Sequence, residues 1–123
     1  IDGTYPVELY PELLQHLRSA QHNEYQEWDH DYKGFAKAAK EEGFEEISHT
    51  FSMISEIEKT HGDRFGRFAD LLEQGKLFVS DVEVKWMCLN CGQIIDATMA
   101  PAVCPVCKHP QGYFIRWELA PFE

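Results

Sequence analysis

A chain of 123 residues with 44% hydrophobic content is long enough for one modest core or for two small folded units. Its formal net charge of −10 opposes attraction to phosphate backbones and to anionic lipid, so we expect neither a nucleic-acid nor a membrane partner. No stretch approaches the roughly 20 apolar residues that cross a bilayer, and the N-terminal segment IDGTYPVELYPELL lacks the features of a signal peptide, which favours the cytoplasm. The sequence starts at Ile1 rather than at methionine, which is consistent with a fragment or with one product of a longer precursor.

After an extended lead over residues 1–10, the sequence predicts two long helices. From Pro11, which suits the first turn of a helix, to Glu42 the chain has no further proline and only one glycine, so one long helix is expected. Gly43 is well placed as its C-cap, and a second helix is expected over about residues 44–74. Two helices joined by so short a connection lie antiparallel and side by side.

Each predicted helix carries polar residues within an otherwise apolar stripe. The stripe of the second helix has spacings of three and four and consists of Phe44, Ile47, Phe51, Ile54, Glu58, His61, Phe65, Phe68 and Leu72. The stripe of the first helix consists of Leu13, Leu17, Ala20, Glu24, Glu27, Asp31, Gly34 and Ala38. A second face of that helix is apolar and aromatic, with Leu14, Tyr25, Trp28, Tyr32 and Phe35. Both faces of the first helix therefore need partners.

Glu24, Glu27, Glu58 and His61 lie at the middle of these stripes. A carboxylate in a helical core is costly unless it is paired, protonated or bound to a metal, and residues three apart project from one helix face. The two pairs thus present carboxylate oxygens and an imidazole towards a common axis, a donor set that suits iron or manganese. The alternative is that both pairs are chance patterns on a solvated face, since the chain has 21 acidic residues. The other helical histidines lack this setting and are expected at the surface: His16, His22, His30 and His49.

Beyond Gly75 the composition shifts to β-type residues, which predicts a helical hairpin over residues 1–75 and a short, turn-rich domain over 76–123. The second domain holds two C-x-x-C pairs separated by 12 residues, formed by Cys88, Cys91, Cys104 and Cys107. In a cytoplasmic chain this pattern indicates a metal site rather than disulfides.

Each C-x-x-C pair can form a tight knuckle whose backbone N–H groups point at the thiolates, and two knuckles close a tetrahedral site of four sulfurs. The spacing does not decide between iron and zinc, and a purely structural zinc site is the alternative. We expect His109 to be a loop residue rather than a ligand, and we expect an aromatic shield from Trp86, Tyr113 and Phe114.

The chain resembles the C-terminal two-thirds of rubrerythrins over about residues 20–115. The matching segments are NEYQEWDHDYKGFAKAAKEEGFEEI, SEIEKTHGDRF, EVKWMCLNCG and APAVCPVCKHPQGYF. The resemblance implies an α+β fold, in which a long antiparallel helical pair completes a ferritin-like four-helix bundle with another chain or segment and a small rubredoxin-like β domain follows. It also implies a carboxylate-bridged di-iron centre and a rubredoxin-type iron bound by the four cysteines, with zinc as a substitute.

The resemblance also implies roles for individual residues. Glu24 matches a terminal carboxylate ligand, Glu58 a bridging carboxylate and His61 a terminal imidazole ligand. Glu27 matches the additional glutamate that distinguishes rubrerythrins and that yields to a histidine on reduction, and Tyr32 matches a tyrosine beside it. The family's first two helices, with that histidine, have no counterpart in this sequence.

The implied function is a non-haem di-iron peroxidase that reduces hydrogen peroxide to water, with electrons delivered through the rubredoxin-type iron. Two alternatives remain open, namely an electron-transfer module that uses only the four-cysteine site and a ferroxidase-type iron-handling bundle. The expected partners are an N-terminal helical half of the same protein or a second copy, within a homo-oligomer, and an electron-donating reductase.

Overall fold

The structure is a computed structural model that describes residues 10–120, so almost all of the predicted extended lead lies outside the described residues. The chain divides into two compact units that meet between Glu73 and Gln74. One unit is helical and the other is a small antiparallel sheet, which confirms the predicted α+β class. Among the described residues, no helix combines the length and the apolar character needed to cross a membrane.

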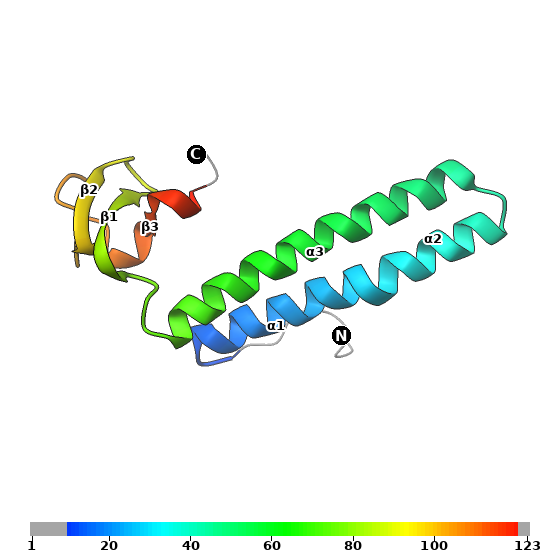
Figure 1. Ribbon diagram of the computed structural model, residues 1–123, viewed down its shortest axis with the longest axis horizontal. Helices are drawn as coiled ribbons and strands as arrows, with labels where there is room; N and C mark the ends of the chain where they lie inside the picture. Colours follow the sequence, from blue (N-terminus) through cyan, green and yellow to red (C-terminus); the bar gives the residue numbers. More distant parts are fainter. Residues whose placement is uncertain (1–9, 121–123) are drawn as a thin grey trace. The chain divides into compact units, whose positions relative to one another are not determined.

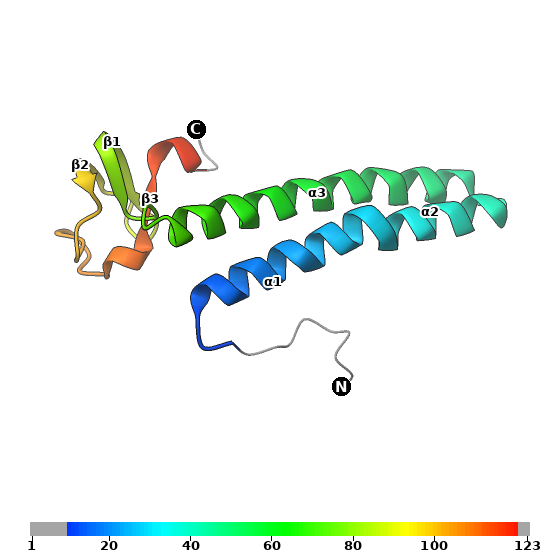
Figure 2. The ribbon, with the colours of Figure 1, turned by 60° about the horizontal axis from the view of Figure 1, so that its bottom comes forward.

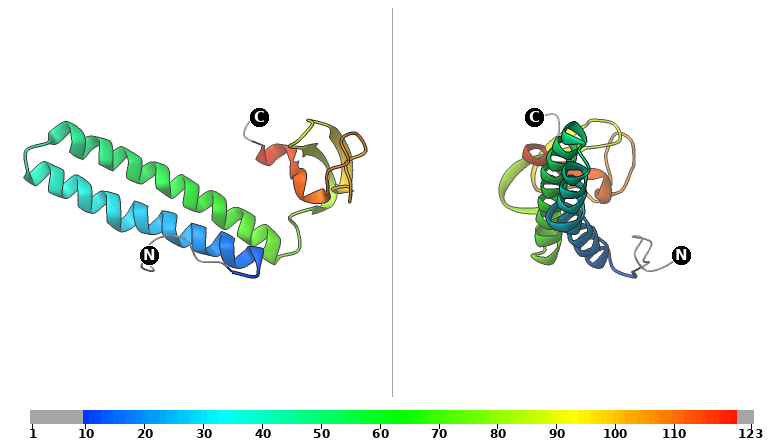
Figure 3. Two further views of the ribbon diagram at one scale, coloured as in Figure 1. Left: turned by 180° about the vertical axis from the view of Figure 1, so that it is seen from behind. Right: turned by 90° about the vertical axis from the view of Figure 1, so that its right-hand side faces the viewer.

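The helical unit is an antiparallel pair. Its first rod comprises α1 (Leu13–Gln26), a π-helical turn (Glu27–Asp31) and α2 (Tyr32–Glu41), and its second is α3 (Glu45–Glu73). Figure 1 shows the first rod lying beside α3 along its whole length, and Figures 2 and 3 show the same pairing from other sides. Gly43 makes the reversal because it has a φ of 88° and donates its N–H to the Lys40 carbonyl, as a helix C-cap does.

Small residues line the contact between the two rods. The buried positions of α3 are Ser48, Ser55, Gly62, Gly66 and Ala69, and those of α2 are Ala36 and Ala39. The larger apolar residues of the predicted stripes are half-buried or exposed, and Phe44 and Ile47 are each at least 50% exposed. The helical pair therefore packs closely along one seam and leaves several of its large side chains exposed.

The predicted long first helix is continuous, but it is not α-helical throughout, because Glu27–Asp31 form a π-helical turn. A π turn closes its hydrogen bonds over one residue more than an α turn, so it rotates the following residues by about 100° relative to an unbroken α-helix. Consequently Ala36 takes the inward position on α2, and Phe35 is 51% exposed. The Phe35 ring packs instead against those of Tyr32 and Phe51, at centroid distances of 5.7 and 5.5 Å.

The second unit contains a three-stranded antiparallel sheet with strand order β2-β1-β3, formed by β1 (Val79–Cys88), β2 (Ile94–Met99) and β3 (Phe114–Arg116). Two short 3-10 turns, Gln111–Tyr113 and Trp117–Leu119, flank β3. The core of this unit is a cluster of Trp86, Cys88, Ala100, Cys104 and Phe114. Two of the three predicted aromatic shields are thus buried, whereas Tyr113 is 41% exposed. The core includes two cysteines, so the fold and the thiol site are built together.

Candidate metal centres

The helical pair brings three of the predicted ligands together. One ligand atom from each of Glu24, Glu58 and His61 lies within 4.8 Å of the other two. His61 Nδ1 lies 2.8 Å from Glu58 Oε2 and 3.5 Å from Glu24 Oε2. Glu58 and His61 come from adjacent turns of α3, and Glu24 reaches them from α1. The three side chains are half-buried and form a small group of hard oxygen and imidazole donors.

The electrostatics of this group fit a bound cation. Burial and the neighbouring Glu58 carboxylate raise the pKa of Glu24 to about 7. Glu24 Oε2 is buried and has no hydrogen-bond partner. A buried carboxylate oxygen without a partner is costly, and a metal ion between the two carboxylates would both satisfy that oxygen and offset their repulsion. Carboxylates with one imidazole are a donor set suited to iron.

Glu27 begins the π turn, and Tyr32 directly follows it as the first residue of α2. Glu27 is half-buried and is outside the group of three, but burial and the charges of Glu58 and Asp31 raise its pKa. Burial, followed by the charge of Glu27, raises the pKa of Tyr32, which therefore keeps its proton. These effects place both side chains in the electrostatic environment of the three-residue group.

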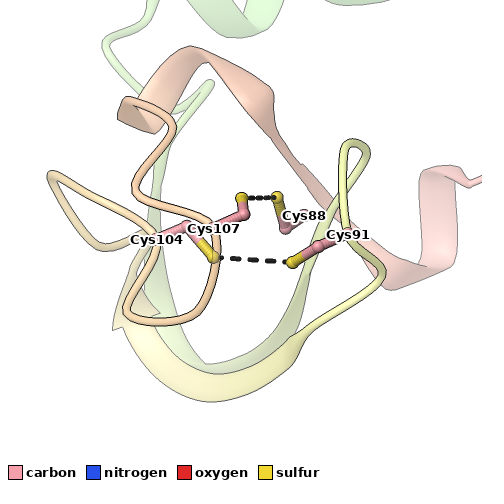
Figure 4. Close-up of side chains that lie close together, drawn as sticks. All are labelled: Cys88, Cys91, Cys104 and Cys107. Atoms are coloured by element: carbon pink, nitrogen blue, oxygen red, sulfur yellow. Dashed lines mark hydrogen bonds between the residues drawn. The ribbon is translucent and has the colours of Figure 1, made fainter.

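The four cysteines of the second unit converge from two loops, as Figure 4 shows. Their sulfurs all lie within 4.8 Å of one another, with 3.7 Å between the Sγ atoms of Cys88 and Cys107 and between those of Cys91 and Cys104. All four are free thiols. His109 is outside this group, as predicted for a loop residue. Four sulfurs at these separations match a tetrahedral thiolate site for iron or zinc.

The two loops repeat one backbone pattern. In the first knuckle the Gly92 N–H donates to the Cys88 carbonyl at 2.8 Å, and in the second the Lys108 N–H donates to the Cys104 carbonyl at 3.0 Å. Gly92 and Lys108 both have positive φ, at 86° and 67°. Lys108 is the one non-glycine residue with positive φ among residues 10–120. Each knuckle is therefore a self-contained turn that aims two cysteines at one point.

The surroundings of the cysteines shift the thiol pKa values of Cys91 and Cys107 in different directions. The His109 backbone N–H lowers the pKa of Cys107 to about 5. The Gln93 backbone N–H also lowers the pKa of Cys91, but burial and the three neighbouring thiols outweigh it and raise that pKa to about 11. Several thiolates in so small a volume repel one another, so full ionisation of the four cysteines needs a metal cation.

Sequence patterns did not single out Ser55, which is 1% exposed and donates a hydrogen bond from Oγ to the Trp28 carbonyl at 2.6 Å. The available signal was a small polar residue on the inward face of α3, seven residues after Ser48. The structure confirms the predicted surface positions of four histidines, which are exposed: His16, His22, His30 and His49.

Two family models match the chain. The model described as "Rubrerythrin" covers residues 3–69, and the model described as "Rubrerythrin, rubredoxin-like domain" covers residues 86–115. The first match spans the helical group of ligands, and the second spans the four cysteines.

Similar proteins carry the same name. Rubrerythrin of Clostridium perfringens is 44% identical over 93% of this chain, and that of Porphyromonas gingivalis is 38% identical over 93%. Rubrerythrin of Nitratidesulfovibrio vulgaris is 35% identical over 95% of this chain. The chain spans 58%, 57% and 63% of the lengths of these three relatives, respectively. A solved structure of nigerythrin in a partially reduced state has a similar fold, with a TM-score of 0.51 and 23% identity over 90% of this chain and 52% of that one.

Proposed function

This chain belongs to the rubrerythrin family, and from that membership and its two metal-ligand groups we propose that it is part of a di-iron peroxidase that reduces hydrogen peroxide to water, with electrons delivered through the four-cysteine iron. The family implies an oxidoreductase with a di-iron centre and a rubredoxin-type iron site. The observation that carries the proposal is that one chain holds two groups of opposite chemical character. The helical unit presents carboxylates and an imidazole, and the sheet unit presents four thiols.

Glu24, Glu58 and His61 are the residues that would hold iron in the helical unit, and we propose Glu27 as a further ligand. When bound, a di-iron centre would supply two electrons to hydrogen peroxide, and a four-thiolate iron would supply one electron at a time. The carboxylates keep negative charge beside the metal positions, which offsets the positive charge gained on oxidation in a site of low dielectric. We propose that the Tyr32 hydroxyl, whose pKa is raised by burial and by the charge of Glu27, donates a hydrogen bond near Glu27.

The four cysteines would hold the rubredoxin-type iron. The backbone N–H that lowers the pKa of Cys107 also stabilises negative charge on that sulfur, as a reversible one-electron site requires. A reducing compartment keeps closely spaced cysteines as free thiols, which can then bind a metal. We therefore propose that the protein is cytoplasmic. An external reductase would supply the electrons.

A two-iron site in a ferritin-like bundle takes its ligands from four helices, and the described residues supply one antiparallel pair. The half-exposed Phe35, Phe44, Ile47 and Ile57 leave room for further helices on this pair. We propose that the completing helices come from an N-terminal half of the same protein, because Glu27 and Tyr32 match the second helical pair of the family. A second copy of this pair is the alternative, and either arrangement is compatible with a homo-oligomer.

The decisive test is turnover by the chain assembled with its completing helices and loaded with iron. We expect consumption of hydrogen peroxide to exceed consumption of dioxygen at equal concentrations, with electrons passing through the four-cysteine iron. A ferroxidase would instead consume dioxygen with ferrous iron and would not need the four-cysteine site. Preferential dioxygen consumption would therefore refute the peroxidase proposal.

Glu27 is the residue on which peroxide chemistry depends most. Glu27→Gln removes the negative charge and keeps the side-chain volume, so we expect the rate of peroxide reduction to fall by about tenfold or more. Assembly and the absorption of the four-cysteine iron should be unchanged. The matched control is Glu56→Gln on the exposed side of α3, which should retain the parental rate. A parental rate in the iron-loaded Glu27→Gln protein would show that this carboxylate has no part in the reaction.

A further inference from the structure

Ser55 meets the first helical rod at its π turn. Its side chain is almost fully buried, and its hydroxyl donates to the Trp28 carbonyl at 2.6 Å. Trp28 is the second residue of the π-helical segment, Glu27–Asp31. The contact therefore joins the middle of α3 to the one irregular turn of the opposite rod.

The geometry of the turn explains why this carbonyl needs a donor. In an α-helix the Trp28 carbonyl accepts the N–H of Tyr32, four residues later. Here the Tyr32 N–H donates to the Glu27 carbonyl, five residues earlier. The Trp28 carbonyl has thus lost its ordinary donor at a partly buried position, and the Ser55 hydroxyl takes the place of that donor.

A second serine on the same face serves as an internal comparison. Ser48 is also buried on α3, seven residues before Ser55, and its hydroxyl donates to the Ala36 carbonyl at 2.6 Å. Ala36 lies within the regular helix α2, where the α-helical pattern already provides each carbonyl with an N–H. The two serines make the same contact, but only Ser55 replaces a backbone donor.

We propose that Ser55 is a positioning residue that holds the π turn and thereby sets the direction in which the Glu27 carboxylate leaves the helix. Without the Ser55 hydroxyl, a return of the turn to the α pattern would give the Trp28 carbonyl the Tyr32 N–H, and it would rotate Glu27 relative to Tyr32 and α2 by about 100°. The role in iron binding rests on the proposed function of Glu27, whereas the role in holding the turn does not.

The first experiment compares amide hydrogen exchange in the full chain without metal for Ser55→Ala and Ser48→Ala. We expect Ser55→Ala to speed exchange of the amides between Trp28 and Lys33 by about fivefold or more, the effect of losing one net hydrogen bond, and Ser48→Ala to leave them unchanged. A structure of Ser55→Ala in which the Tyr32 N–H has moved to the Trp28 carbonyl would support the proposal equally. If exchange is unaltered and the π turn persists in Ser55→Ala, the proposal is overturned.

The second experiment measures iron content, absorption of the helical iron site and peroxide turnover in the assembled, iron-loaded protein. We expect Ser55→Ala to change that absorption and to slow turnover in the same direction as Glu27→Gln, with the four-cysteine iron unaffected. Ser48→Ala should match the parental protein. A Ser55→Ala protein with parental iron content and spectrum would overturn the link to Glu27. If the parental protein itself does not reduce peroxide, the proposed function fails, and iron content and absorption still decide the role of Ser55.

Discussion

The two ligand groups differ in how far along the chain their residues lie. The first and last of the four cysteines are 19 positions apart within one small unit, and each pair is aimed by the backbone turn that contains it. The helical group joins Glu24 to residues 58 and 61 on a different helix, and its ligands depend on how the two rods pack. A site made from local turns carries all its donors within one unit, whereas a site made from helix faces needs every helix of the bundle.

The two ligand groups also differ in how their surroundings shift the pKa values of the ligands. The backbone N–H of His109 stabilises negative charge on Cys107 before any metal binds, and this lowers the thiol pKa. In the helical group the carboxylates face one another, and burial with the Glu58 charge raises the pKa of Glu24 instead. The thiol site is partly prepared by the fold, while the carboxylate site depends on a cation for its charge balance.

The largest expected effect comes from breaking the four-thiol site. Cys88 is fully buried in the core of its unit, so Cys88→Ser should abolish the ferric-thiolate absorption and destabilise this unit while the helical content persists. Visible absorption, iron analysis and far-UV circular dichroism measure the three effects. Leu89→Ala, an exposed change within the same knuckle, is the control and should remain red. A colourless parental protein with one zinc per chain, after expression with ample iron, would contradict the electron-transfer role.

The next effect tests the dependence of the helical group on further helices. Because one antiparallel pair supplies only three converging donors among the described residues, we expect the chain as a monomer to hold no bridged pair of irons. Iron beyond the four-cysteine site should appear only with an increase in molecular mass, on adding the completing helices or on self-association. Mass measurement together with iron analysis decides this, and a monomer with two bridged irons would refute it.

Sequence patterns predicted the features that depend on local residue types. Gly43 marked the helix reversal, the two C-x-x-C pairs marked the knuckles, and the polar interruptions of the apolar stripes marked Glu24, Glu58 and His61. Each of these signals rests on a periodicity or on a residue with a special backbone preference.

The π turn could not be predicted in this way. Its segment, EWDHD, contains no glycine or proline, and no residue in it disfavours the α conformation strongly enough to mark a break. The partner of its free carbonyl, Ser55, is 27 residues away in sequence and comes near only when the rods pack. After that turn Ala36 and Ala39 are the buried residues of α2, whereas the predicted stripe placed Ala38 inward. Features that depend on contacts between helices are not encoded in the periodicity of either helix alone.

The close contact between the two helical rods can be tested by comparing alanine substitutions at a packed and at an uncontacted glycine. A Cβ on Gly62 would lie 2.5 Å from the Tyr25 ring, a rigid group, so Gly62→Ala should cost about 1–3 kcal/mol through overpacking. A Cβ on Gly34 meets nothing within 4 Å, and Gly34→Ala should stabilise the pair by about 1 kcal/mol through helix propensity. Urea unfolding followed by the far-UV signal compares the two. Equal effects would show that the close approach of the rods at Gly62 is not present in solution.

The smallest effect distinguishes the two knuckles of the thiol site. Gly92 and Lys108 occupy equivalent positions with positive φ, a conformation that costs a non-glycine residue about 1–2 kcal/mol. Lys108→Gly removes that cost but makes the unfolded chain more flexible, so the net gain in stability should be about 0.5–1 kcal/mol. The lost Lys108 Nζ contact with the Pro105 carbonyl, 2.9 Å long and exposed, offsets little of that gain.

Gly92→Ala is the reciprocal change. Since its Cβ would meet nothing within 4 Å, any loss of stability reports the backbone conformation alone. The midpoint of guanidinium-induced loss of the iron absorption should therefore rise for Lys108→Gly and fall for Gly92→Ala. A fall for both would mean that the Lys108 side chain stabilises the site by more than its backbone conformation costs.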